Sequence, residues 1–125
     1  MRTTLDTPSA PAAIGPYNVA VEAAGLVFIS GQVAFDPATS EKLIGDAESE
    51  TRRIMENLGG ILGDIGLGFE DIVKTTIFMT DIGDYAAVNA VYADYVGAAP
   101  PARSAIQVAA LPAGFNVEIE VIAAR

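Results

Sequence analysis

Residues 100–122 read PPARSAIQVAALPAGFNVEIEVI, and they decide the fold because they carry two strands directly after a proline pair. Pro100 and Pro101 cannot continue a helix, so they close the helical segment before them. The strands are apolar except for a few charges, among them Arg103, Glu118 and Glu120. Charge inside an apolar strand needs a reason, and this stretch is therefore the first candidate for a functional site.

Two segments upstream have the periodicity of amphipathic helices. The first runs from Asp46 to about Ile65 and has acidic residues early, which suits a helix N-terminus. Its glycines at 59, 60 and 63 each cost helix propensity, by about 1 kcal/mol against alanine, so we expect close packing on a sheet to compensate. The second runs from about Gly83 to Tyr95, and its tyrosines share one face that we expect to lie in the core.

The remaining apolar runs predict strands. Residues 18–22 and 26–30 are expected to form a hairpin, with Gly31 ending its second strand. Residues 71–80, DIVKTTIFMT, are rich in β-branched side chains and predict a central strand. The other expected strands are a weak one near 42–44 and two clear ones over 103–108 and 115–123.

The order of these elements, ββ(β)αβαββ, predicts an α+β fold of two layers, with two helices on one face of a mixed sheet. We expect a single domain over residues 1–125, because a chain of this length with 51% hydrophobic residues can bury a real core. The other face of the sheet would then need a cover, which self-association would supply. The apolar side chains that we assign to that face are Val33, Ile77, Met79 and Ile119.

Composition excludes several classes of function. With 16 acidic and 7 basic residues the net charge is −9, which repels phosphate backbones and anionic membranes, so we expect neither nucleic acid nor membrane as a partner. The chain has no cysteine and no histidine, so thiolate catalysis, histidine bases and Cys/His metal sites are absent. It has no signal-peptide core and no apolar run near the roughly 18 residues of a membrane span. We expect a cytoplasmic location.

The two clear C-terminal strands raise the question of whether Arg103 and Glu118 meet. If the strands pair antiparallel through the turn ALPAG, any register with an odd sum of paired residue numbers puts both side chains on one face. The sequence leaves that register open. Two interpretations therefore stand: an ordinary cross-strand ion pair at a solvated edge, or a guanidinium that anchors a ligand carboxylate beside a water-activating glutamate.

Several motifs along the chain support the second interpretation. They are APAAIGPY, ISGQV, DIVKTTIFMTDI, YAAVNAVY, and PARSAIQVAALP followed by VEIE. Together, and in this order, they closely resemble the RidA/YjgF family of reactive-intermediate deaminases over nearly the whole chain. The resemblance implies a chorismate-mutase-like α+β fold, a homotrimer with three sites in the clefts between subunits, and hydrolysis of enamines and imines such as 2-aminoacrylate to keto acids and ammonia.

The same resemblance assigns roles to individual residues. Arg103 matches the arginine that binds the substrate carboxylate, and Glu118 matches the acid associated with the reacting water. Ser30 has no histidine or lysine base in its motif, so we expect a hydrogen-bonding wall rather than a nucleophile. The residues that match the substrate-binding pocket are Tyr17, Ser30, Gly31, Asn89, Arg103 and Ala105.

Two positions depart from the family pattern. Ala105 stands where many members have cysteine, which rules out thiol chemistry there and leaves a mechanism through water and backbone intact. Gln107 stands where glutamate is often found, which can change pocket polarity or substrate choice.

The residues and the resemblance together predict a hydrolytic deaminase of imines such as 2-iminopropanoate, with catalytic residues Arg103 and Glu118. We expect no cofactor and no metal, a small imino or keto acid as ligand, and further copies of the chain as partners. The alternative is a non-catalytic or regulatory protein of the same fold that binds a small carboxylate or keto acid. A chorismate-mutase-type rearrangement would need several cations around a dicarboxylate, and only one arginine is well placed.

Overall fold

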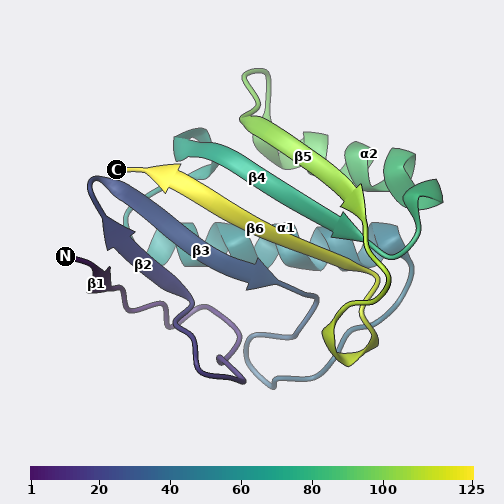
Figure 1. The fold of residues 1–125 in the computed structure, drawn as a ribbon, viewed down its shortest axis with the longest axis horizontal. Coiled ribbons are helices and arrows are strands. Elements are labelled where there is room, and N and C mark those ends of the chain that lie inside the picture. The colour runs from purple at the N-terminus through teal and green to yellow at the C-terminus, as the bar shows by residue number, and fades with distance from the viewer.

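The computed structural model describes all 125 residues and forms one six-stranded sheet with two long helices (Figure 1). The strands lie side by side in the order β1-β2-β3-β6-β4-β5. The helices are α1 (Ala47–Asp64) and α2 (Tyr85–Val96). The strands are β1 (Thr3–Thr4), β2 (Ala20–Ala23), β3 (Leu26–Gln32), β4 (Ile72–Met79), β5 (Ala102–Gln107) and β6 (Val117–Ala124).

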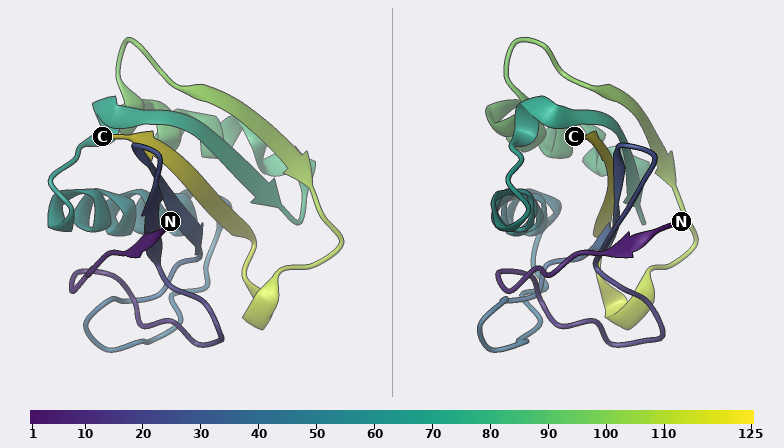
Figure 2. Two further views of the ribbon diagram at one scale, coloured as in Figure 1. Left: turned by 60° about the vertical axis from the view of Figure 1, so that its left-hand side comes forward. Right: turned by 90° about the vertical axis from the view of Figure 1, so that its left-hand side faces the viewer.

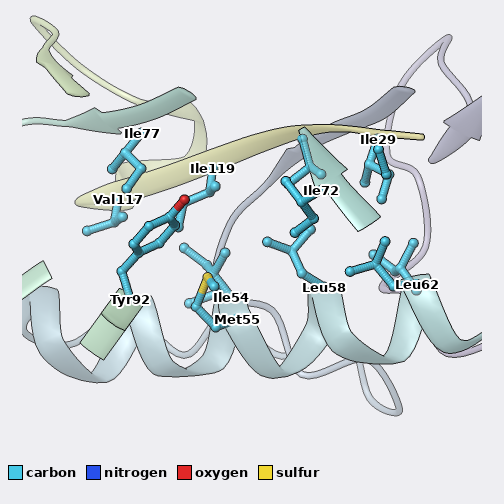
Figure 3. Close-up of a cluster of buried hydrophobic side chains, with 14 of the residues drawn as sticks. Ile29, Ile54, Met55, Leu58, Leu62, Ile72, Ile77, Tyr92, Val117 and Ile119 are labelled. Carbon is cyan, nitrogen blue, oxygen red and sulfur yellow. The ribbon is translucent and has the colours of Figure 1, made fainter. Parts of the chain in front are cut away.

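Both helices cover the same face of the sheet, so the predicted two-layer α+β architecture is confirmed (Figure 2). The first helix begins where expected because the Asp46 side chain accepts a hydrogen bond from the Ser49 backbone N–H at 2.8 Å. One face of α1 points at the sheet, and Ile54, Leu58 and Leu62 are completely buried there (Figure 3). Burial of these apolar side chains holds the two layers together.

The antiparallel pairing that we considered for the last two strands does not form. β5 pairs in parallel with β4, with Arg103 opposite Thr75. β6 pairs antiparallel with the other edge of β4, with Glu118 opposite Phe78. The reason is that α2 carries the chain from the end of β4 back to its start, and such a crossover places the next strand parallel beside the first. The strand β4 therefore lies between β5 and β6.

Three smaller expectations also change. Gly31 does not end the second hairpin strand; it lies inside β3, at a shift of register against β6 between Ile29 and Gln32. The weak strand near 42–44 is reduced to a single bridge between Phe35 and Lys42. The short strand β1 was not predicted, because two threonines carry no periodic signal.

The open face of the sheet has other residues than those we assigned to it. Ile77, Met79 and Ile119 have no exposed surface and lie in the core under the helices, so that assignment is wrong. Side chains alternate between the two faces along a strand, so an assignment that is shifted by one residue exchanges the faces. The burial pattern places these three side chains under the helices. The apolar side chains that alternate with the core positions of β3, β4, β5 and β6 are Phe28, Phe78, Ile106 and Ile122.

The glycines of α1 pack differently from our expectation. A Cβ at Gly59 would lie 3.2 Å from the Phe69 ring, and one at Gly60 would lie 3.2 Å from the Ser9 side chain. The close approach is therefore to the N-terminal loop and to Phe69, not to the sheet. Neither α1 nor α2 has the length and apolar composition that a membrane-spanning helix requires.

Candidate functional site

A pocket of about 270 Å³ opens where β6 begins, between the N-terminal loop and the segment that follows β3. We call it the acidic pocket, because Glu118 is the only ionisable carboxylate in its lining. Its polar lining consists of Tyr17, Ser30, Gly31 and Glu118. Its apolar lining consists of Ile14, Val33, Phe35, Pro112, Ala113 and Phe115. Three of the residues predicted to bind substrate, Tyr17, Ser30 and Gly31, therefore lie together with Glu118, which was predicted to be catalytic.

The carboxylate of Glu118 lies directly against the backbone of Gly31. A Cβ at that glycine would lie 2.5 Å from Oε2 and 2.8 Å from Cδ of Glu118. Real Cβ atoms do not approach oxygen so closely, so any side chain at position 31 would force the carboxylate to move. The missing side chain at Gly31 thus lets the carboxylate lie against the backbone, at the point where the register of β3 against β6 shifts.

Glu118 is half-buried and belongs to no ion pair. Burial raises the pKa of the Glu118 carboxyl, and the neighbouring carboxylate of Glu120 raises it further. A carboxyl group with a raised pKa at the wall of a pocket is suited to accept and return protons.

The other polar residues of the acidic pocket are held by local hydrogen bonds. The Ser30 hydroxyl donates to the Asn18 carbonyl at 2.7 Å, which agrees with a wall and not with a nucleophile. The Tyr17 ring is 44% exposed, and its hydroxyl accepts a long bond of 3.4 Å from the Ile14 backbone N–H. Phe35 and Phe115 pack edge to face with ring centroids 5.0 Å apart and form an apolar wall.

Arg103 lies elsewhere, in a second hollow of about 390 Å³ between α2 and the start of β5. We call it the arginine cleft. It is lined by Asn89, Tyr92, Ala93, Val96, Gly97, Pro100, Pro101 and Arg103. Arg103 lies opposite Thr75 in the parallel pairing of β4 and β5, so the two side chains are on the same face of the sheet. Thr75 is buried on the helix side, where its Oγ1 lies 2.8 Å from the Tyr92 hydroxyl. The side chain of Arg103 therefore points toward α2.

The guanidinium of Arg103 is held by side chains of α2. Its Nη1 donates to Asn89 Oδ1 at 2.6 Å, and its Nη2 donates to the Tyr85 hydroxyl at 2.9 Å. The guanidinium carbon lies 5.5 Å from the ring centroid of Tyr85 and 5.2 Å from that of Tyr92. Asn89 therefore belongs to the arginine cleft and contacts Arg103 directly.

Arg103 and Glu118 do not meet within one protomer. Arg103 is on the helix-covered face of the sheet, and Glu118 alternates with the buried residues Val117 and Ile119 and is on the open face. The expectation of a shared face rested on direct pairing of β5 with β6, and in the structure β4 lies between these strands. The predicted site residues therefore form two groups, one in the acidic pocket and one in the arginine cleft.

Comparison with known proteins identifies the family. The family model described as Endoribonuclease L-PSP matches residues 7–125. The chain belongs to the RidA/YjgF family. It is 44% identical over 125 residues to the 2-iminobutanoate/2-iminopropanoate deaminase of Mus musculus, covering 100% of this chain and 93% of that protein.

Other RidA/YjgF relatives have other names. The chain is 49% identical over 124 residues to Protein DfrA of Myxococcus xanthus, covering 98% of this chain and 95% of that protein. Among solved structures, E. coli TdcF with bound serine has a TM-score of 0.90 and 41% identity, covering 98% of each chain. Membership of the RidA/YjgF family is thus shown over the whole fold, while the names of its members differ.

The two departures from the RidA/YjgF pattern lie outside the acidic pocket. Ala105 is half-buried against the core on the same face of β5 as Arg103. Gln107 is exposed at the end of β5, and its Oε1 accepts a hydrogen bond from the Ile82 backbone N–H at 2.8 Å. In this protomer Gln107 therefore holds the turn before α2.

Sequence reasoning missed Tyr85, which it placed in the core. The side chain is 41% exposed and binds Arg103, whereas Tyr92 on the same helix is 5% exposed. The spacing of Tyr85 and Asn89, one helical turn apart, was a signal that both could reach one partner. Nowhere do three or more acidic side chains gather in a way that could hold a metal ion.

Proposed function

We propose that this protein hydrolyses enamines and imines of small 2-amino acids, such as 2-aminoacrylate and 2-iminopropanoate, to 2-keto acids and ammonia. Membership of the RidA/YjgF family supports the class of reaction, and a relative named for this deamination covers the whole chain. Arg103 binds the substrate carboxylate, and Glu118 moves protons to and from water and the substrate nitrogen. The protein works as a homotrimer with its sites between subunits.

One observation carries the proposal: a free cation and a free, half-buried carboxylate lie on opposite faces of one sheet. Neither Arg103 nor Glu118 has an ion-pair partner in the protomer. A site that uses both groups needs the arginine cleft of one copy and the acidic pocket of another. The exposed apolar residues of the open face, Phe28 and Ile106, supply a surface on which copies can associate.

The chemistry follows from these two groups. The enamine gains a proton at its terminal carbon, loses one from its nitrogen to solvent, and becomes the imine. The oxygen of water then bonds to the C=N carbon while a water proton passes to Glu118. Glu118 returns that proton to the nitrogen, which gives a carbon bearing OH and NH2. The hydroxyl proton then passes to the nitrogen, the C–N bond breaks with its electron pair leaving on ammonia, and the C=O bond forms. Arg103 holds the carboxylate by charge-assisted hydrogen bonds and so orients the reacting carbon.

The family description names an endoribonuclease, and charge argues against that activity here. The net charge of −9 opposes binding of a polyanion, because affinity for nucleic acid depends on neutralising phosphates with Lys and Arg. The chain also has no histidine to serve as an acid or base in phosphodiester cleavage. A small carboxylate needs only one well-placed guanidinium.

The test is Glu118→Gln, assayed with 2-aminoacrylate that a serine dehydratase generates from serine. Pyruvate release is followed with and without the protein, and pyruvate binding is measured by calorimetry. We expect turnover to fall to the spontaneous rate, at least about a hundredfold, because the proton carrier is lost. Binding of pyruvate should stay within a fewfold of wild type, since Arg103 is unchanged.

Two outcomes would decide against the proposal. If the wild-type protein leaves the spontaneous rate unchanged with several imino acids yet binds pyruvate through Arg103, the protein is the non-catalytic carboxylate-binding member of this fold. If Arg103→Met binds pyruvate as tightly as wild type, Arg103 is not the carboxylate anchor. Glu41→Gln, the same change at an exposed residue outside both hollows, should behave as wild type.

A further inference from the structure

The arginine cleft contains a feature that the reaction above does not use: both acceptors on the Arg103 guanidinium are neutral. The amide oxygen of Asn89 takes a hydrogen from Nη1 at 2.6 Å, and the hydroxyl oxygen of Tyr85 takes one from Nη2 at 2.9 Å. Both come from α2, where a separation of four residues places them on one side of the helix. The helix thus fixes the guanidinium at two points.

This arrangement leaves the positive charge of Arg103 uncompensated. The protomer has two ion pairs, Arg52 with Asp94 and Arg125 with Glu22, and Arg103 is in neither. The rings of Tyr85 and Tyr92 lie at cation–π distance and add attraction without cancelling the charge. A guanidinium has five N–H donors, so two bonds to neutral acceptors leave several donors free for an anion.

We propose that Tyr85 is a positioning residue for Arg103, whose hydroxyl, together with the amide of Asn89, forms a neutral clamp that orients the guanidinium and keeps its charge available to a ligand carboxylate. This inference rests on the proposed function. The clamp explains why α2 presents a hydroxyl and an amide to the arginine. A carboxylate at either place would hold the guanidinium as firmly and would compete with the ligand for its charge.

The hydroxyl can be tested apart from the ring, because Tyr85→Phe removes one oxygen and keeps the aromatic contact. Without its Nη2 acceptor the guanidinium is free to turn, and binding must then restore its orientation. We expect the dissociation constant of pyruvate, measured by calorimetry, to rise about three- to tenfold through loss of a hydrogen bond to a charged group. With the imine substrate KM should rise by a similar factor, while kcat stays near wild type, because Glu118 lies on another element.

Tyr95→Phe provides the matched control. It is the same chemical change on the same helix, and the Tyr95 ring packs on Phe69 with centroids 5.6 Å apart, away from Arg103. We expect wild-type KM and wild-type pyruvate affinity. Tyr85→Phe should also melt at the wild-type temperature, since its side chain is 41% exposed and its hydroxyl supports only the arginine.

The variant Asn89→Asp tests whether the neutrality of the clamp matters separately from its positioning of the Arg103 guanidinium. The side chain keeps its size and its acceptor at Nη1 but adds a carboxylate to the clamp. If the neutrality of the clamp matters, pyruvate affinity should fall more than in Tyr85→Phe, by about tenfold or more, although the guanidinium is held at least as firmly. Unchanged affinity in Asn89→Asp would overturn the neutral clamp.

The remaining outcomes also decide. Unchanged affinity in Tyr85→Phe would show that the hydroxyl does not position Arg103. Tighter binding in that variant would show that Tyr85 competes with the ligand, which also overturns the inference. Arg103→Met distinguishes failure of this inference from failure of the proposed function. If Arg103→Met abolishes pyruvate binding while the Tyr85 and Asn89 variants bind pyruvate as wild type, the proposed function stands and only this inference fails.

Discussion

At the scale of single residues, the pKa of Glu118 connects the structure to pH dependence. Burial raises the pKa of this carboxyl first, and the charge of Glu120 on the same face of β6 adds to the effect. As the base that accepts a water proton, Glu118 must be ionised. Activity that depends on this base should therefore rise with pH through a pKa above the ordinary value of a glutamate.

Removing the charge of Glu120 should lower that pKa. In Glu120→Gln the repulsion disappears while the burial remains, so the pKa of Glu118 falls only part of the way to its ordinary value. We expect the acidic limb of the plot of kcat/KM against pH to move to lower pH, with the plateau rate kept. Steady-state kinetics from pH 5 to pH 8 would show this, and Glu41→Gln serves as the control. A limb that stays in place would mean that another group controls the profile.

At the scale of elements, a buried carboxylate joins α1 to the loops that frame the acidic pocket. Glu50 has no exposed surface. Its Oε1 accepts hydrogen bonds from the backbone N–H groups of Asn116 and Val117, and its Oε2 accepts from Gly45 N–H and from the Asn116 amide. Glu50 thereby helps to fix the start of β6 at Val117, one residue before Glu118.

Loss of this carboxylate should be costly. In Glu50→Ala the donors of the 45 and 116–117 segments lose their acceptor inside the protein, and a buried unsatisfied polar group costs about 1–3 kcal/mol. We expect the free energy of unfolding to fall by about 3 kcal/mol or more, as measured by urea denaturation. Glu48→Ala, at an exposed position of the same helical turn, should change it by less than about 0.5 kcal/mol. A loss in Glu50→Ala as small as that would contradict the role of Glu50 in joining these loops.

The elements also show where sequence patterns were sufficient. The predicted helix over 46–65 and the strand over 71–80 are confirmed to within a residue or two, because apolar periodicity and the Asp46 cap are local signals. The neighbours of β5 and β6 are not a local property. They depend on how α2 packs across the sheet, and no residue of either strand encodes which partner it meets.

At the scale of the whole molecule, we propose that copies of the chain associate through the open face of the sheet. Phe28 is 43% exposed and Ile106 is 44% exposed, on strands β3 and β5. They flank the strands that carry Phe78 and Ile122, so apolar side chains extend across the sheet opposite the helices. In the homotrimer that we propose, other copies of the chain would cover this face.

A charge on this face should prevent that assembly. In Phe28→Asp a carboxylate replaces an apolar side chain that the trimer would bury, and an unpaired buried charge is strongly unfavourable. We expect light scattering to report about three times the chain mass for wild type and a smaller species for the variant. Deaminase activity should be lost with the trimer. Ile44→Asp, at a residue 46% exposed in the loop before α1, is the control. Full activity in a monomeric Phe28→Asp would contradict sites between subunits.

The sequence by itself determined the helices, most of the strands, the two-layer architecture and the family, because these depend on local periodicity and on motifs read in order. It also indicated Arg103, Glu118, Tyr17, Ser30 and Gly31 as one set of residues. Only the tertiary structure decided that Arg103 and Glu118 lie on opposite faces, and that Tyr85 binds the arginine instead of filling the core. The physical reason is strand order, because the crossover through α2 places β5 beside β4 and leaves β4 between β5 and β6. Side chains alternate along each strand, so Arg103 lies on the helix-covered face and Glu118 on the open face.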